Sequence, residues 1–320
     1  MGGNVHLVVV LDGAAQDGRI GSAPRALTGE RLLDAAAARL TQLERRWSRF
    51  VDDSEICLLG RSAGPLEVSA DTRLLVAWCV TAFRRSRGRF DAGVLAALEK
   101  QGYDRSFDEV LERSPAATPA PIPAAGKPLR GPGCDEIVID DDAGTVTLPA
   151  GLRLDPGGIA KGLAADLVTA ELLASGAAGA CVNVAGDLRA RGLGPADGGG
   201  RWLVGVEHPT RVDRPLAMIP LPPGGGAVAS SSVLSRRWGG GRHHVIDPGL
   251  GRPANSDVVA ATVVADDGVW ADAATKIALV PAGRRQAIAE LDRLDVAALL
   301  VCRDGTVIPT AAFPPSSARA

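Results

Sequence analysis

The chain has 320 residues, of which 46% are hydrophobic and 22% are charged, and its net charge is −2. These values are typical of a globular protein with a sizeable core, and they argue against a basic nucleic-acid-binding surface or an acidic disordered tail. Aromatic residues make up only 3%, which disfavours a row of stacking platforms for single-stranded nucleic acid.

The cysteines and the N-terminus indicate the compartment. Five cysteines are scattered along the chain without the spacing of a metal site, and their number is odd. Residues 1–6 lack a basic region, and the apolar run 8–11 is too short for the core of a signal peptide. No apolar run approaches the length of a membrane span. We therefore expect a reduced, cytoplasmic protein, and the sequence gives no indication of its oligomeric state.

The first half of the chain is expected to contain helices, short strands and one extended break. Hydrophobic periodicity and turn residues predict a strand at 5–11, helices at 31–50 and 72–85, a short helix ending at Lys100, and a hairpin at 136–140 and 145–148. Asp71 is the expected N-cap of the second helix. Six prolines between residues 112 and 134 predict an extended surface excursion.

The second half is expected to be richer in strands. The predicted strands are 180–184, 202–207, 216–221, 227–229, 258–265, 297–302 and 305–308, and the predicted helices are 164–174, 269–280 and 283–291. Strands that follow one another directly, with helices in blocks, are typical of an α+β fold with antiparallel sheet. We expect residues 1–320 to form one domain that includes the proline-rich excursion at 112–134.

A glycine turn between a short apolar run and a helix is the first candidate site. The sequence from Asp155 through Gly158 to Lys161 and Gly162 combines a carboxylate, several glycines and a lysine. Glycines allow backbone N–H groups to approach a ligand, and a helix N-terminus with a lysine favours negative charge. The pattern predicts an anion site, and the alternative is a tight turn with a surface lysine.

Four further constellations carry polar groups. They are Phe90-Asp91, Asn183 to Asp187, His243-His244 through Asp247 to Pro253, and Asp272 with Thr275 and Lys276. The two histidines are expected on a strand, and Asp272, Thr275 and Lys276 share one helical face. The alternatives are structural: Asp247 caps a turn, and Asp272 only pairs with Lys276.

The order of these motifs resembles the ApbE family of FAD:protein FMN transferases. The matching segments are Asp155–Gly162, Asn183–Asp187 with Ala185 in place of a glycine, His244–Pro253 and Ala271–Ala273. Weaker matches are Asp53–Ile56 and Phe90-Asp91. The resemblance covers nearly the full length of the chain.

The resemblance implies a T-fold-related α+β domain that binds FAD. Such enzymes use Mg²⁺ to cleave the pyrophosphate and join FMN to a threonine or serine hydroxyl of an acceptor protein, which carries a Ser/Thr-Gly-Ala-Ser/Thr signature, with release of AMP. Asp91, Asp155, Lys161 and the backbone at Val245 and Ile246 would line the flavin site.

The resemblance also implies the catalytic and metal-binding groups. His244 has a suitable pKa to accept the hydroxyl proton, Lys161 would steady an oxyanion, and Asp272 would complete the catalytic set. Mg²⁺ prefers oxygen ligands, and these would come from Asp272, the carbonyl near Gly158 and Thr275.

One departure from the family pattern concerns the metal. The family usually has a threonine four residues after the helix aspartate, where this chain has Lys276, and Thr275 comes one residue earlier. The lysine would repel Mg²⁺ or take its place beside the phosphates, or a local shift would bring Thr275 to the metal. Two alternative functions remain open. One is an FAD pyrophosphatase that yields FMN and AMP, with water as the nucleophile, and the other is a non-catalytic flavin-binding protein in which Lys276 has displaced the metal.

Overall fold

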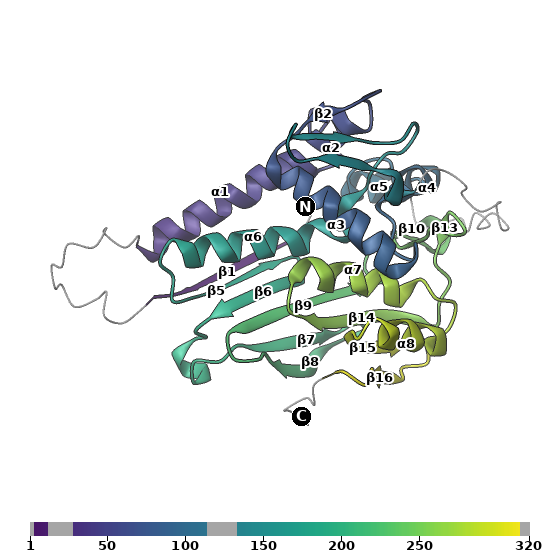
Figure 1. The fold of residues 1–320 in the computed structure, drawn as a ribbon. Helices are drawn as coiled ribbons and strands as arrows, with labels where there is room; N and C mark the ends of the chain where they lie inside the picture. The colour runs from purple at the N-terminus through teal and green to yellow at the C-terminus, as the bar shows by residue number, and fades with distance from the viewer. Residues whose placement is uncertain (1–2, 12–27, 114–132, 314–320) are drawn as a thin grey trace.

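The computed structural model describes residues 3–11, 28–113 and 133–313, and it is built around a seven-stranded sheet (Figure 1). The strand order is β1 (Val5–Val10), β5 (Gly179–Val184), β6 (Asp187–Gly192), β9 (Gly225–Ser232), β14 (Val258–Ala265), β15 (Ala297–Cys302) and β16 (Val307–Pro309). Every neighbouring pair is antiparallel. The expected α+β class with antiparallel sheet is confirmed.

Both faces of the sheet are covered, by different kinds of element. Helices α6 (Ala160–Ala174) and α7 (Gly268–Leu279) pack on one face, with α1 (Gly29–Trp47), α3 (Ala70–Ser86) and α8 (Arg284–Arg293) around them (Figure 1). Side chains alternate between faces along a strand. In β9, Ala227 and Ala229 accordingly join the core under the helices, whereas Val228 joins a second cluster with residues of the hairpin β7 (Leu203–His208) and β8 (Arg211–Pro220).

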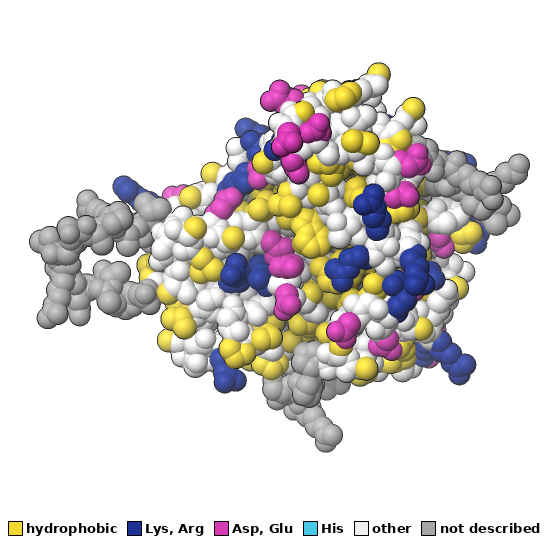
Figure 2. All heavy atoms as spheres, viewed as in Figure 1, with side chains coloured by type: hydrophobic (Ala, Val, Ile, Leu, Met, Phe, Trp, Pro, Cys, Tyr) yellow, Lys and Arg dark blue, Asp and Glu magenta, His cyan; other side chains and the backbone are white. Residues whose placement is uncertain are grey.

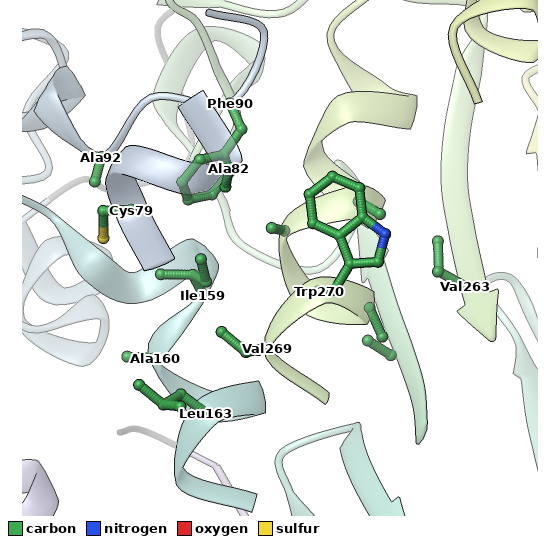
Figure 3. Close-up of a cluster of buried hydrophobic side chains, with 14 of the residues drawn as sticks. Cys79, Ala82, Phe90, Ala92, Ile159, Ala160, Leu163, Val263, Val269 and Trp270 are labelled. Carbon is green, nitrogen blue, oxygen red and sulfur yellow. The ribbon is translucent and has the colours of Figure 1, made fainter. Parts of the chain in front are cut away.

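The main core lies where α3, α6 and α7 meet. Figure 3 shows Cys79 and Ala82 of α3, Leu163 of α6, and Val269 and Trp270 of α7 gathered in one space. Burying apolar surface contributes roughly 25 cal/mol per Å². This cluster therefore fixes α6 and α7 against each other and, with them, the polar residues that they carry.

Smaller elements complete the fold. They are α2 (Glu55–Leu59), β2 (Leu66–Glu67), α4 (Leu95–Lys100), α5 (Phe107–Arg113), the hairpin β3 (Val138–Asp140) and β4 (Thr145–Thr147), β10 (Arg237–Trp238), β11 (Arg242–His243), β12 (Ile246–Asp247) and β13 (Arg252–Pro253). A short 3₁₀ turn, η4 (Pro156–Gly158), precedes α6.

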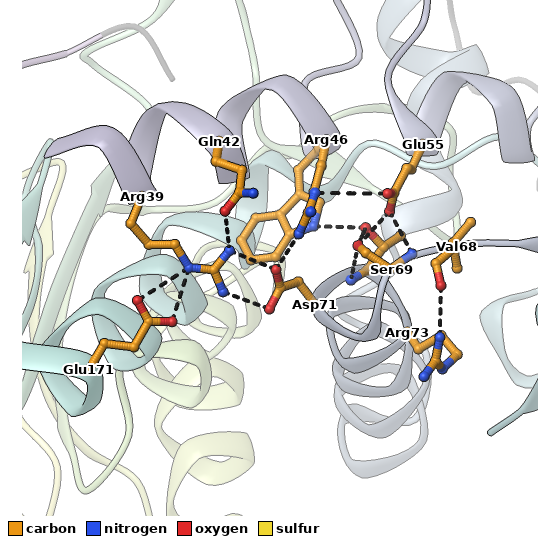
Figure 4. A network of polar contacts seen from close by, with 11 residues as sticks. Arg39, Gln42, Arg46, Glu55, Val68, Ser69, Asp71, Arg73 and Glu171 are labelled. Carbon is orange, nitrogen blue, oxygen red and sulfur yellow. Dashed lines mark hydrogen bonds and ion pairs between the residues drawn. The ribbon is translucent and has the colours of Figure 1, made fainter. Parts of the chain in front are cut away.

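Most predicted elements are confirmed within a few residues, and one cap assignment is wrong. The N-cap of α3 is Ser69, whose hydroxyl accepts a hydrogen bond from the Thr72 N–H at 3.3 Å. Asp71 instead binds Arg39 at 2.8 Å and also pairs with Arg46, and this network joins α1 to α3 and, through Glu171, to α6 (Figure 4). The capping residue is therefore Ser69, two positions before Asp71, and the Asp71 carboxylate forms ion pairs with two arginines instead.

Elements missing from the sequence prediction include α2, β2, α5, β6 and β10. Of the proline-rich excursion at 112–134, residues 114–132 lie outside the described residues. The assignment of residues 1–320 to one domain stays a prediction.

The visible surface carries mixed charge. On the face shown in Figure 2, acidic and basic side chains lie interspersed among apolar and uncharged groups. Among the described helices, none is both long enough and apolar enough to cross a membrane.

Gly162 allows α6 and α7 to approach each other closely. A Cβ added there would lie 2.1 Å from the Gly268 carbonyl oxygen and 2.9 Å from the Asp272 Cβ. The backbone N–H of Gly162 also donates to Asp272 Oδ2 at 3.2 Å. A side chain at this position would therefore separate the helices and weaken that hydrogen bond.

We expect Gly162→Ala to lower the free energy of unfolding by about 1–3 kcal/mol, because overpacking against backbone cannot be relieved by a side-chain rotation. Urea denaturation measures the change. Gly64→Ala is the matched control, because an added Cβ there has no neighbour within 4 Å. An equal effect of both substitutions would contradict the proposed close approach.

Candidate functional site

A cavity of about 710 Å³ lies beside the glycine turn, in the size range typical of ligand sites. Seven of the nine residues nominated from the sequence line it: Asp91, Asp155, Gly158, Lys161, His244, Val245 and Ile246. The other two, Asp272 and Thr275, are fully buried. The structure therefore brings the separate motifs together around one space.

Asp155 and Asp91 have their carboxylates fixed by local contacts. Asp155 caps η4 by accepting from the Gly157 N–H at 2.8 Å, and its other oxygen lies 3.2 Å from Arg49 Nε. Asp91 accepts from the Gly93 N–H at 2.7 Å and from Cys134 Sγ at 3.1 Å. Burial raises the pKa of Asp91 above its usual value. Both residues thus shape the cavity wall through the turns that they cap.

Lys161 joins three elements at the first turn of α6. Its ammonium lies 2.7 Å from Asp187 Oδ2 and 3.3 Å from Asp272 Oδ2, and it donates to the Gly157 carbonyl at 3.2 Å. Burial acts to lower the pKa of Lys161, but the two carboxylates outweigh burial and the pKa is raised. Lys161 is therefore a fixed positive charge, not a free surface lysine as in the alternative interpretation of the turn.

Asp272 has both carboxylate oxygens engaged. Oδ1 accepts from the Lys276 ammonium one helical turn away, and Oδ2 accepts from Lys161 and the Gly162 N–H. Burial acts to raise the pKa of Asp272, but the two ammonium groups outweigh it and the pKa is lowered. Asp272 is therefore a buried anion between two cations, and the structural alternative of pairing with Lys276 is confirmed as a contact.

Thr275 does not line the cavity. Its hydroxyl donates to the Asp272 carbonyl at 2.7 Å and lies 2.8 Å from the Ser231 hydroxyl of β9. Because the side chain is fully buried, these contacts use its hydrogen-bonding capacity. The residue holds α7 against the sheet.

The expected Mg²⁺ ligands do not fit a Mg²⁺ ion in this arrangement. Mg²⁺ requires near-octahedral oxygen ligands at about 2.0–2.1 Å, yet both Asp272 oxygens already accept from cations or an N–H group. The described residues include no group of three or more acidic, histidine or cysteine side chains suited to a metal. An ammonium about 4 Å from a divalent ion would repel it by roughly 8 kcal/mol at an effective dielectric constant of 20.

The two histidines differ from the prediction because they do not lie on one strand. β11 ends at His243, and His244 lies in the connection to β12. His243 Nε2 contacts the Ala254 carbonyl at 2.9 Å, whereas His244 reaches the cavity. Asp247 accepts from the Gly249 and Leu250 N–H groups at 2.9 and 3.2 Å, so the structural interpretation of Asp247 as a turn cap is confirmed.

His244 is held neutral by its surroundings. Burial, together with the charges of Arg236 and Lys276, lowers its pKa to about 3. Its Nδ1 atom has no hydrogen-bond partner among the described residues. A neutral imidazole with an available nitrogen can accept a proton or a hydrogen bond from a ligand.

Several lining residues were not identified from the sequence. Five described cationic side chains reach the cavity: Lys161 and Lys276, which belong to the sequence motifs, and Arg49, Arg89 and Arg236, which do not. The Arg49 guanidinium also stacks 4.2 Å from the Phe50 ring and 4.5 Å from the Tyr103 ring. Arg49 belongs to none of the sequence motifs. The only sequence signal for it was its position beside an aromatic residue at the end of a predicted amphipathic helix.

Comparison with known proteins identifies the family. The model of the ApbE family matches residues 1–300. The chain belongs to the ApbE family. This membership agrees with the glycine turn, the buried helix aspartate and the histidine segment that surround the cavity.

Relatives within the ApbE family match most of the chain. The FAD:protein FMN transferase of Vibrio cholerae is 27% identical over 277 residues, which make up 83% of this chain and 78% of that protein. The FAD:protein FMN transferase of Haemophilus influenzae is 25% identical over 285 residues, which make up 86% and 80%. The crystal structure of the ApbE protein from Thermotoga maritima superposes with a TM-score of 0.73 at 24% identity, over 90% of this chain and 92% of that one.

We expect the protein to lose stability as the pH falls from 6.5 towards 3. The folded protein keeps His244 neutral until the pH approaches its lowered pKa of about 3, whereas a histidine in the unfolded chain binds a proton near its ordinary pKa of 6.5. The stabilisation is therefore complete above pH 6.5 and declines by at most about 1.4 kcal/mol per pH unit.

His244→Gln tests this expectation, because it removes the titrating group. Urea denaturation at several pH values should show a shallower loss of stability on acidification for this variant than for the parent. His208→Gln, which removes a histidine outside the cavity, is the matched control. Identical pH profiles for the parent and His244→Gln would contradict the assignment.

Proposed function

We propose that this protein is an FAD:protein FMN transferase that attaches FMN to a threonine or serine hydroxyl of an acceptor protein and releases AMP. Membership of the ApbE family and the names of the Vibrio cholerae and Haemophilus influenzae relatives support the reaction. The observation that carries the proposal is the cavity, which is lined by both a fixed lysine of the glycine turn, Lys161, and a neutral histidine, His244.

The cavity is suited to a dinucleotide with aromatic rings and a pyrophosphate. Trp47, Phe50, Phe90 and Tyr103 provide apolar and aromatic surface for the rings. The five cationic side chains named above provide partners for phosphate oxygens. Val245 and Ile246, whose backbone the resemblance assigns to the flavin, line the same space.

The transfer is a phosphoryl substitution at the phosphorus atom on the FMN side. The acceptor hydroxyl oxygen attacks this phosphorus and forms a new P–O bond, while the P–O bond to the AMP phosphate breaks and its electron pair leaves with AMP. Such reactions depend mainly on positioning and on stabilisation of charge. The fixed positive charge of Lys161 stabilises the phosphate oxygens as charge moves towards the leaving group.

His244 accepts the proton of the acceptor hydroxyl. Burial and two nearby cations lower the pKa of His244, and the phosphate charge of a bound substrate would offset those cations. The bound substrate therefore raises the basicity of His244 when the proton must be taken up. None of these steps uses Mg²⁺, because its expected ligands are already engaged.

Asp272 acts through the lysines as a positioning residue. It does not line the cavity, and its oxygens hold Lys161 and Lys276 at the wall. Asp187 also holds Lys161, at 2.7 Å, and burial raises the pKa of Asp187.

The test is incubation with FAD, Mg²⁺ and an acceptor domain that carries the Ser/Thr-Gly-Ala-Ser/Thr signature. We expect flavin fluorescence on the denatured acceptor and an equal amount of AMP in solution. AMP and free FMN without labelled acceptor would identify a pyrophosphatase instead. Bound, intact FAD without AMP would identify a flavin-binding protein and contradict the proposal.

Lys161→Met should lower the transfer rate by roughly 10²–10³-fold, as expected for the loss of one fixed group that stabilises a developing charge. The rate is measured from covalent flavin fluorescence over time. Lys100→Met changes an exposed lysine outside the cavity and should keep the parent rate. A rate for Lys161→Met close to that of the parent would exclude the proposed role, provided that its thermal unfolding shows a folded protein.

A further inference from the structure

Lys276 occupies the space between two residues nominated as metal ligands. Its ammonium contacts Asp272 Oδ1 and lies 3.1 Å from the Asp272 carbonyl oxygen. Its aliphatic chain passes close to Gly158, where an added Cβ would lie 3.5 Å from Lys276 Cε. The positive charge of this side chain therefore lies where the resemblance places the divalent cation.

Lys276 also reaches the cavity. It is among the lining residues together with Lys161 and Gly158, whereas Asp272 and Thr275 are not. Asp272 holds both ammonium groups, one at each carboxylate oxygen. The Asp272 carboxylate thus holds two ammonium groups at one wall of the cavity, one at each of its oxygens.

Two lysines held in this way form a site for a dianionic group. The Lys276 ammonium has three N–H donors, and Asp272 accepts from two of them. The third donor of Lys276 is available to a phosphate oxygen. The Lys161 ammonium already contacts three acceptors and contributes its fixed positive charge, and lysine is a common point-charge partner for phosphate. Displacing the lysine by a metal would instead separate a buried ion pair.

We propose that the Lys276 ammonium replaces the divalent cation and, together with Lys161, binds the pyrophosphate of the dinucleotide, so that substrate binding and cleavage need no metal. This inference rests on the proposed function for the identity of the substrate. Lys276 forms no covalent bond in the reaction: it donates a hydrogen bond to a phosphate oxygen, and the bonds made and broken are those of the phosphoryl substitution above.

The first test measures FAD affinity by quenching of flavin fluorescence, in EDTA and in excess Mg²⁺. The parent protein should bind FAD equally well in both. Lys276→Met should bind roughly 10- to 100-fold more weakly in both, the range expected for loss of a charged hydrogen bond. Lys276→Arg keeps the charge and should retain metal-independent binding, and Lys100→Met is the control outside the cavity.

The second test measures the metal directly and does not depend on FAD turnover. Mn²⁺ is titrated into the protein, and the free ion is followed by its paramagnetic resonance signal. The parent should bind no stoichiometric Mn²⁺, whereas Lys276→Thr, which restores the usual threonine of the family, should gain one site. Thermal unfolding of each variant establishes that it is folded.

Two results would overturn the proposal: stoichiometric Mn²⁺ binding by the parent, or a loss of FAD affinity when the parent is treated with EDTA. Failure of the proposed function is a separate outcome. In that case the parent would bind no FAD in either buffer, or would not label the acceptor with Mg²⁺ present, while the Mn²⁺ titration would still report whether Lys276 replaces the metal.

Discussion

The structure depends on one buried carboxylate. Asp272 is fully buried on α7, where an unpaired charge would be unstable, and it is compensated by Lys161, Lys276 and the Gly162 N–H. Removing one partner of such a buried pair typically costs about 3–5 kcal/mol. Asp272 therefore fixes the relative position of α6 and α7 and, through them, the lysines at the cavity wall. Stability and function share the same contacts.

The packing around this carboxylate explains why small residues surround it. Gly162 lets the two helices approach closely enough for its N–H to reach Asp272, and Gly158 leaves room for the aliphatic part of Lys276. Thr275 binds α7 to the sheet through Ser231. A side chain enlarged at any of these positions would move a charge away from the cavity. The glycines of the glycine turn are thus required both for the close approach of the α6 and α7 backbones and for the placement of the two ammonium groups.

The sequence predicted the fold class and most elements because hydrophobic periodicity reports directly on burial, as in α1, α6 and β14. The sequence predicted elements less well where the local residue pattern does not determine the secondary structure or the cap. β6 contains two arginines and follows a glycine turn, and Ser69 rather than Asp71 caps α3 because Asp71 binds distant arginines. The clustering of Asp91, Asp155, Lys161 and His244 was expected from motif order. The stacking of Arg49 on Tyr103 and the pairing of Asp272 with Lys161 arise from contacts between segments far apart in the chain, which no single sequence pattern reports.

The most direct test of this account is a crystal structure of the parent protein with bound FAD, from crystals grown in Mn²⁺, with anomalous data collected at the manganese edge. The account predicts the Lys276 ammonium within hydrogen-bond distance of a phosphate oxygen, still paired with Asp272, and no anomalous peak between Asp272 and Gly158. A manganese peak coordinated by Asp272, with Lys276 turned away, would contradict it.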